Sequence, residues 1–260
     1  MDKNNNLYSL GIDLGSSTAK IVLSLGDTVI YKKYERHFSQ VRQKTLQMLG
    51  EIKSLLKDKE FTVAFSGSAG FGVSQMTKYD FVQEVFATAE YVKEEFSDAN
   101  NVIELGGEDA KIIFFKGGID ERMNGTCAGG TGAFIDQMAI LLNISVEELD
   151  SLSLKSTKIY PIASRCGVFA KTDIQALLNQ GATKEDVAAS IYQSVVNQTI
   201  SGLAQGRKIE GKTLFLGGPL YFCKGLQKRF VETLKISEED AIFPSYALFF
   251  VALGASKNNA

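Results

Sequence analysis

Hydrophobic and polar positions alternate in three short runs at the start of the chain and then change to a helical period. Alternation over a few residues between glycine turns is typical of strands, and apolar residues three or four positions apart are typical of a helix. The predicted elements of this first part are strands at 7–15, 18–26 and 28–36, a helix at 40–57, a strand that enters a glycine-rich turn within 61–72, and a helix at 81–96.

The same order of patterns begins again at Asn100. The predicted elements are strands at 100–107, 110–118 and 119–125, helices at 131–142, 168–180 and 184–207, a strand at 212–218, a helix at 221–234 and a closing helix at 245–260. Three strands followed by helices, occurring twice, predict two similar α/β halves around a cleft. We expect residues 1–98 with the closing helix to form one half and residues 99–244 the other.

Composition excludes several classes of protein. The chain has 260 residues, 45% of them hydrophobic, which is ample for a core. Lys plus Arg number 28 against 30 for Asp plus Glu, so nothing in the charge favours nucleic acid as a partner. No apolar run reaches the roughly 18 residues of a membrane span, and the N-terminal residues lack the apolar segment of a signal peptide. We therefore expect a cytoplasmic protein without a membrane partner.

The cysteines and the histidine limit the metal chemistry. Cys127, Cys166 and Cys223 are too few and too far apart for a disulfide framework, and none belongs to a CxxC pair. His37 is the only histidine, which excludes a histidine-rich zinc or copper site within one chain.

Four glycine-containing motifs follow predicted strands. The first is GIDLGSSTAK, whose turn offers backbone N–H and hydroxyl donors that suit phosphate oxygens, while its carboxylate suits a hydrated Mg²⁺. Its candidate residues are Asp13, Gly15, Ser16, Ser17, Thr18 and Lys20. The alternative interpretation is an ordinary hairpin with a polar tip.

The other three motifs lie in the second half. The second motif, ELGGEDAK, repeats the order of the first: a carboxylate, a glycine pair and a new strand. The third, CAGGTG, leads into a helix N-terminus, which favours anions. The fourth, FLGGPLYF, contains glycines without side chains, so a flat nucleoside can approach the backbone closely. Their candidate residues are Glu104, Gly106, Gly107 and Asp109 in the second motif, Gly129, Gly130 and Thr131 in the third, and Gly217 and Gly218 in the fourth.

None of these motifs is a P-loop or a dinucleotide GxGxxG fingerprint. Together they resemble the actin, sugar-kinase and chaperone ATPase superfamily, whose duplicated ribonuclease-H-like halves enclose ATP. The stretches NGTCAGGTGAFIDQMA and ASRCGVFAKTDIQALLNQG narrow this resemblance to the ATP-dependent activators of 2-hydroxyacyl-CoA dehydratases, the BadF/BadG/BcrA/BcrD type. The chain looks closest to the N-terminal module of large multidomain activases.

The resemblance implies ATP or ADP as ligand, with Mg²⁺ held through water by Asp13 and Glu104. It also implies one 4Fe–4S cluster shared by a homodimer, with Cys127 and Cys166 as its ligands in each subunit. The cluster would pass a low-potential electron, received from ferredoxin or flavodoxin, to an iron–sulfur dehydratase. Asp13, Glu104 and Asp109 are the candidates for the residue that orients the hydrolytic water, and Asp109 could instead cap its turn. Cys223 has no such context and is interpreted as structural.

The chain departs from the small activators at two places. Its second motif begins with Glu104 where they usually carry Asp and reads GGED rather than GGQD, and its fourth motif continues as PLYF. Two other functions remain open: a small-molecule kinase of the sugar-kinase type, which would need a catalytic carboxylate in an acceptor pocket, and a regulatory ATPase without a cluster.

Overall fold

The computed structural model describes residues 7–124 and 129–258. The chain divides into two compact units. The first consists of Met1–Asp98 together with Leu248–Ala260, and the second of Ala99–Ala247. Among the described residues, no helix is both long enough and apolar enough to cross a bilayer.

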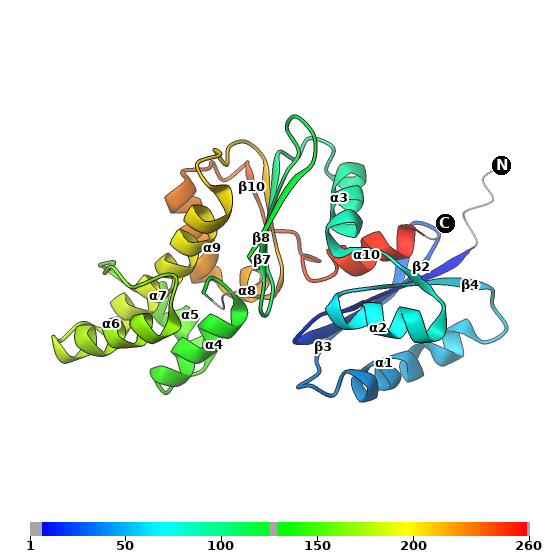
Figure 1. Cartoon of the computed structure of the whole chain (residues 1–260), viewed down its shortest axis with the longest axis horizontal. Coiled ribbons are helices and arrows are strands. Elements are labelled where there is room, and N and C mark those ends of the chain that lie inside the picture. The colour runs from blue at the N-terminus through cyan, green and yellow to red at the C-terminus, as the bar shows by residue number, and fades with distance from the viewer. Residues whose placement is uncertain (1–6, 125–128, 259–260) are drawn as a thin grey trace. The chain divides into compact units, whose positions relative to one another are not determined.

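The first unit is a five-stranded mixed sheet between helices (Figure 1). Its elements are β1 (Tyr8–Leu14), β2 (Thr18–Leu25), β3 (Thr28–Arg36), α1 (Val41–Leu56), β4 (Phe61–Ser66), α2 (Ser68–Thr77), β5 (Asp80–Phe81), α3 (Glu84–Glu95) and α10 (Phe250–Lys257). The strand order is β3-β2-β1-β4-β5; β1 runs antiparallel to β2 and parallel to β4.

Both faces of this sheet are covered. Leu10, Ile12 and Leu14 alternate along β1 and share one core cluster with Met48 and Ile52 of α1. On the opposite face Ala64 of β4 packs with residues of α3 and α10. The period-two alternation of β1 therefore places its even-numbered residues under α1 and its odd-numbered residues under α10.

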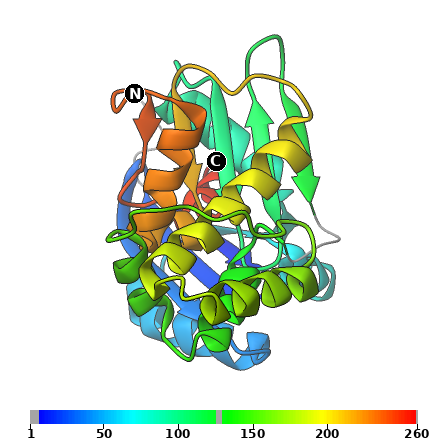
Figure 2. The same cartoon turned by 90° about the vertical axis from the view of Figure 1, so that its left-hand side faces the viewer.

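The second unit has a five-stranded sheet of its own and more helices. Its elements are β6 (Asn101–Leu105), β7 (Ala110–Phe114), β8 (Asp120–Asn124), α4 (Gly132–Leu141), α5 (Val146–Ser153), α6 (Gly167–Asn179), α7 (Lys184–Thr199), the π-helical turn η2 (Ile200–Ala204), β9 (Thr213–Leu216), α8 (Gly218–Phe222), α9 (Lys224–Leu234) and β10 (Ala241–Ile242). Figure 2 views this unit from its helical side, with α9 in orange. One large cluster of buried residues joins these helices to β6, β7 and β9.

The two sheets have the same topology. The second sheet has the order β8-β7-β6-β9-β10, with β6 antiparallel to β7 and parallel to β9, which repeats the first sheet strand for strand. The duplicated α/β fold predicted from the sequence is confirmed.

Several element boundaries differ from the prediction. The glycine-rich turn after β4 is helix α2, since Ala69 and Val73 pack on the core and outweigh the low helix propensity of Gly70 and Gly72. Helix α5 was not predicted. The helix predicted from Phe81 begins at Glu84, because Phe81 pairs with β4. The closing helix covers Phe250–Lys257 rather than 245–260.

The helix predicted at 221–234 is interrupted at Cys223, whose backbone is extended. The Asp150 carboxylate accepts hydrogen bonds from the N–H groups of Lys224 (3.0 Å) and Gly225 (2.8 Å), so it caps a new helix there. A side chain distant in the sequence thus sets this boundary.

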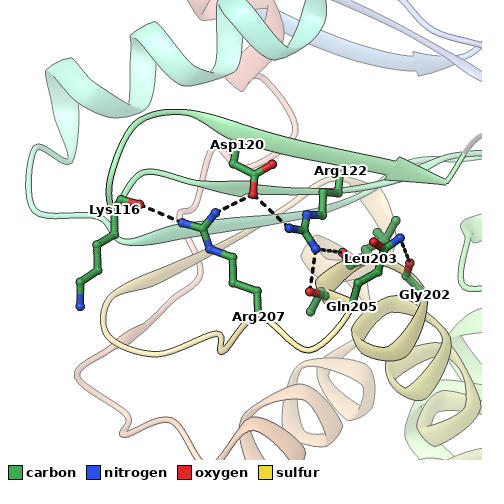
Figure 3. Close-up of polar contacts among 8 residues, drawn as sticks. Lys116, Asp120, Arg122, Gly202, Leu203, Gln205 and Arg207 are labelled. Carbon is green, nitrogen blue, oxygen red and sulfur yellow. Dashed lines mark hydrogen bonds and ion pairs between the residues drawn. The ribbon is translucent and has the colours of Figure 1, made fainter.

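The helix predicted at 184–207 ends at Thr199 and continues as the π-helical turn, which ends at a left-handed Gln205. Arg122 of β8 donates to the carbonyls of Leu203 (3.4 Å) and Ala204 (2.8 Å). Arg207 and Arg122 both contact Asp120 (Figure 3). Their hydrogen bonds hold the pKa of Asp120 below its ordinary value. The contacts of Asp120, Arg122 and Arg207 thus connect the end of the helix to the β7–β8 hairpin.

Candidate functional site

The first candidate turn joins β1 to β2. Gly15 N–H donates to the Thr18 carbonyl (3.0 Å), which closes the turn. Asp13 at the end of β1 is the direct cross-strand partner of Lys20, and Lys20 Nζ lies 2.8 Å from Asp13 Oδ2 with both side chains mostly buried. The structure thus brings a carboxylate and an ammonium group together at the base of the predicted phosphate turn.

A second segment of the first unit reaches the same place and was missed in the sequence. Gly67 follows β4 with φ +87°, and a Cβ there would lie 2.3 Å from the Leu14 carbonyl oxygen and 2.6 Å from Asp13 Oδ1. Ser66 is the register partner of Asp13, and its buried hydroxyl has no partner within the described residues. A buried carboxylate beside an unsatisfied hydroxyl is a donor set that fits a hydrated cation.

The second candidate turn joins β6 to β7 and has the same closure. Gly106 N–H donates to the Asp109 carbonyl (2.8 Å). Glu104 is the cross-strand partner of Lys111, as Asp13 is of Lys20. Lys111 was not singled out in the sequence, although the spacing from carboxylate to lysine is the same in both motifs.

Asp109 has a structural position in this turn. Its Oδ2 lies 2.8 Å from Lys111 Nζ, whose side chain is only 4% exposed. A Cβ on Gly106 would lie 2.1 Å from Asp109 Oδ1, so the carboxylate fills the space above that glycine. This geometry agrees with the interpretation of Asp109 as a cap of the turn.

The third motif is hydrogen-bonded to the second. Gly132 N–H donates to the Gly106 carbonyl (3.0 Å), and Ala133 N–H donates to the Gly107 carbonyl (2.8 Å). These N–H groups belong to the first turn of α4, whose N-terminus was expected to favour an anion. Two of its donors therefore bind the neighbouring turn, and the adjoining Thr131 is fully buried.

The fourth motif adjoins the same strand. Gly217 has φ +88°, and a Cβ there would lie 2.1 Å from the Leu105 carbonyl oxygen. Gly67 has the same relation to Leu14 in the first unit, so the two glycines are structural equivalents. Gly218 begins α8, and the following Pro219 lies beside Gly132 of the third motif. The structure thus brings the second, third and fourth motifs together within one unit.

The third motif also adjoins the segment before Cys166. A Cβ on Gly129 would lie 2.7 Å from the Ser164 carbonyl oxygen and 3.2 Å from that of Arg165. Cys166 is half-buried at the N-cap position of α6, as the sequence predicts. Cys127 lies outside the described residues, two positions before Gly129 in the sequence.

Cys223 has a different environment. It is buried, and burial raises the pKa of its thiol to about 11, with a further contribution from Asp150. A protonated thiol is a poor metal ligand, which agrees with the structural interpretation. Among the described residues, no group of three or more His, Cys, Asp or Glu side chains is arranged to hold a metal ion.

A family model described as the BadF/BadG/BcrA/BcrD ATPase family matches residues 10–257. The chain belongs to this ATPase family. A similar relative is the (R)-2-hydroxyglutaryl-CoA dehydratase activating ATPase of Acidaminococcus fermentans, which is 33% identical over 221 residues covering 82% of this chain and 83% of the relative.

Two solved structures of activators have the same fold as this family member. The A. fermentans (R)-2-hydroxyglutaryl-CoA dehydratase component A has a TM-score of 0.87 with 27% identity, over 98% of both chains. The activator of 2-hydroxyisocaproyl-CoA dehydratase from Clostridium difficile, solved with bound ADPNP, has a TM-score of 0.83 with 25% identity, over 97% of this chain and 94% of its own. Both matches support the duplicated actin and sugar-kinase type of ATPase fold.

Proposed function

We propose that this chain is an ATP-hydrolysing activator that delivers a low-potential electron to a 2-hydroxyacyl-CoA dehydratase or a related iron–sulfur enzyme. The names of its relatives support the activator role and a dehydratase as partner. The electron would come from ferredoxin or flavodoxin. The structural observation that carries the proposal is the contact between the glycine motifs of the second unit and the segment that leads to Cys166.

That contact is a short path through the backbone. The Gly106 carbonyl binds Gly132 N–H at the start of α4, and Gly129, three residues earlier, lies against Ser164 and Arg165. Cys166 follows directly. These two contacts connect the turn at Gly106 to the residue before Cys166, and we propose that they couple the nucleotide site to the redox site.

We propose that MgATP or MgADP binds at the two equivalent turns. Gly15 to Thr18 with Lys20, and Gly106 and Gly107, would contact phosphate; Gly129, Gly130 and Thr131 would support the second turn; Gly217 and Gly218 would adjoin the nucleoside. Asp13 and Glu104 would hold Mg²⁺ through water, and the ion would supply positive charge to the phosphates. The buried Asp13 carboxylate beside the unsatisfied Ser66 hydroxyl supports this assignment.

We further propose that Cys127 and Cys166 of two subunits hold one 4Fe–4S cluster, which would supply one-electron chemistry. Cys166 lies at the N-cap position of α6, beside the positive end of the helix dipole, which suits the negative charge of such a cluster. Val168 and Phe169, in the first turn of α6, are 70% and 66% exposed. Such apolar side chains beside a ligand suit a face that a second copy covers.

The first experiment measures iron and acid-labile sulfide in protein purified without oxygen. We expect brown protein with about four irons per dimer. Cys127→Ser and Cys166→Ser should lose the iron and keep the affinity for ADP. Cys223→Ser is the matched control and should keep both. Colourless wild-type protein that cannot be reconstituted with iron and sulfide would refute the electron-transfer proposal and favour a regulatory ATPase.

A second experiment tests the proposed dimer by sedimentation. Phe169→Asp should yield monomers that bind ADP but contain no iron, because only two ligands remain in one chain. Met76→Asp changes an exposed apolar side chain of α2 in the first unit and should leave the dimer intact. A dimer that persists in Phe169→Asp would place the subunit contact elsewhere.

The kinase alternative has its own test. Production of ADP from ATP that is stimulated by a small molecule, with phosphorylation of that molecule, would favour the kinase.

A further inference from the structure

His37, the only histidine of the chain, is held against the first candidate phosphate turn. It follows β3 and is 2% exposed. Its backbone N–H donates to the Ser17 carbonyl (3.2 Å), and its ring Nε2 lies 3.0 Å from the Gly15 carbonyl oxygen. Because a carbonyl oxygen can only accept, Nε2 carries the proton. Nδ1 is buried as well and has no hydrogen-bond partner in the described part of the chain.

These two hydrogen bonds fix the directions of two peptide groups. In a trans peptide the C=O and N–H of one unit point in opposite directions. A Gly15 carbonyl directed at His37 therefore turns Ser16 N–H away from His37, and a Ser17 carbonyl directed at His37 does the same for Thr18 N–H. Backbone N–H groups that point out of one turn in this way can together donate to an anion.

The second unit holds the equivalent carbonyl by other means. Gly106 corresponds to Gly15, since each closes its turn with a hydrogen bond to the residue three positions later. The Gly106 carbonyl accepts from Gly132 N–H, at the start of α4. In the first unit the corresponding carbonyl has the imidazole of His37 as its partner. The carbonyl of the turn glycine is thus held by a hydrogen bond from outside the turn in both units, which suggests that this peptide needs a fixed orientation.

We propose that His37 is a positioning residue for nucleotide binding, which holds the Gly15–Thr18 turn with its N–H groups directed at phosphate. The role acts through the turn, and His37 itself does not touch the nucleotide. The inference rests on the proposed assignment of MgATP and MgADP to this turn.

The test compares two side chains that differ in reach. The amide nitrogen of Gln can occupy the place of Nε2, whereas that of Asn ends near the place of Nδ1. The dissociation constant of a fluorescent ADP analogue is measured with Mg²⁺ on the full chain. His37→Asn should weaken binding about fivefold to tenfold, the effect of losing one neutral hydrogen bond, and His37→Gln should stay within about twofold of the wild type.

A control separates this effect from general loss of stability. Ile52→Val makes a small cavity in the core of the same unit, under the same sheet, and should lower the melting temperature without changing the affinity. Equal affinities of His37→Asn and the wild type would overturn the proposal, as would a loss in His37→Gln as large as in His37→Asn. Wild-type protein that binds no nucleotide would refute the proposed function first, and this role with it.

A spectroscopic readout is independent of the variants and of nucleotide. Because the chain has one histidine, its imidazole gives a single set of ¹⁵N resonances. We expect the tautomer with the proton on Nε2 and a bare Nδ1. A proton on Nδ1 instead would exclude the hydrogen bond to Gly15 and overturn the proposal.

Discussion

The turns that follow β1 and β6 are closed by the same hydrogen bond but differ in the group that binds the carbonyl of their glycine. Each closes with a hydrogen bond from its glycine N–H to the residue three positions later. The Gly15 carbonyl is held by a side chain, His37, and the Gly106 carbonyl by the start of a helix, through Gly132. The two units thus share the hydrogen bond that closes the turn, while each holds the glycine carbonyl with a donor from its own later residues.

The lysines of the two turns differ in a similar way. Lys20 pairs with Asp13, the carboxylate directly across the strand. Lys111 occupies the equivalent position but pairs with Asp109 of the turn itself. The second turn carries a carboxylate, Asp109, where the first turn has Thr18, and this carboxylate contacts the lysine of its own motif.

The largest expected effect tests whether Gly67 and Gly217 are equivalent. Gly67→Ala and Gly217→Ala should each lower the free energy of unfolding by more than about 3 kcal/mol, because a clash with backbone adds to strain at positive φ. Gly181→Ala is the control, since its φ is +85° but a Cβ there meets nothing within 4 Å; it should cost about 1–2 kcal/mol. Urea unfolding measures all three. Equal losses in Gly217→Ala and Gly181→Ala would mean that the close approach is unimportant.

The next effect distinguishes the two lysines. Lys20→Met should cost about 3 kcal/mol of unfolding free energy, because it leaves the buried Asp13 carboxylate without this partner. Lys111→Met should cost about 1 kcal/mol, since Asp109 is a third exposed and water can solvate it. Chemical denaturation at neutral pH gives both values. The reverse order would show that burial of the lysine, rather than of the carboxylate, governs the loss.

A smaller, pH-dependent effect tests the segment between the third strand and the fourth, where the first unit has α1 and the second has helices α4 to α7. Asp186 of α7 accepts from the N–H groups of Thr157 (2.8 Å) and Lys158 (2.9 Å), and these bonds hold its pKa below the ordinary 3.8. A lowered pKa stabilises the fold above the unfolded pKa, and this contribution is lost as the pH falls through the folded value.

Asp186→Asn should therefore cost about 2 kcal/mol near pH 7, and the difference from the wild type should shrink as the pH falls below about 4. Thermal unfolding across this range measures it. Asp27→Asn, in the exposed turn between β2 and β3, is the control and should change stability at neither end. A difference that does not depend on pH would mean that the ionised carboxylate is not what matters.

The smallest effects compare the ion pairs of the two hairpins. Arg207→Gln removes the contacts with Asp120 and with the Phe114 ring, whose centroid lies 4.2 Å from the guanidinium carbon. Lys33→Gln, on the β2–β3 hairpin, removes contacts with Glu35 of the same strand and with Glu51 of α1. We expect about 1 kcal/mol or less for Arg207→Gln and about half of that for Lys33→Gln, because such pairs are solvated. Calorimetric melting measures the loss of stability in each variant. A larger loss for Lys33→Gln would contradict a stabilising contact between Arg207 and the Phe114 ring.

The strands and the turns were predictable from the sequence because their signals are local. Alternation along residues 8–14 and glycine after a carboxylate need no knowledge of the fold. Lys111 was predictable in principle, since it stands at the same distance from Glu104 as Lys20 does from Asp13. Only the shared cross-strand register makes that spacing meaningful.

Other features depend on contacts between distant segments. Helix α2 carries glycines that disfavour a helix and forms because its apolar side chains reach the core. The interruption at Cys223 depends on Asp150, and the role of His37 depends on a ring that reaches back 22 residues to Gly15. Local patterns do not reveal these partners, because they lie far away in the sequence. From the sequence alone, His37 is therefore only evidence against a histidine-rich metal site.

Helix α10 belongs to the first unit although the whole second unit precedes it in the chain. It packs so closely on β1 and α3 that a Cβ on Gly11 would lie 1.9 Å from the Ala252 carbonyl oxygen, and one on Gly254 would lie 2.0 Å from that of Ala87. During synthesis the ribosome therefore releases every residue of the second unit before the first unit can bury Ala64 and Ala87. The nascent chain carries an incomplete first unit until α10 has been made, after the whole of the second unit.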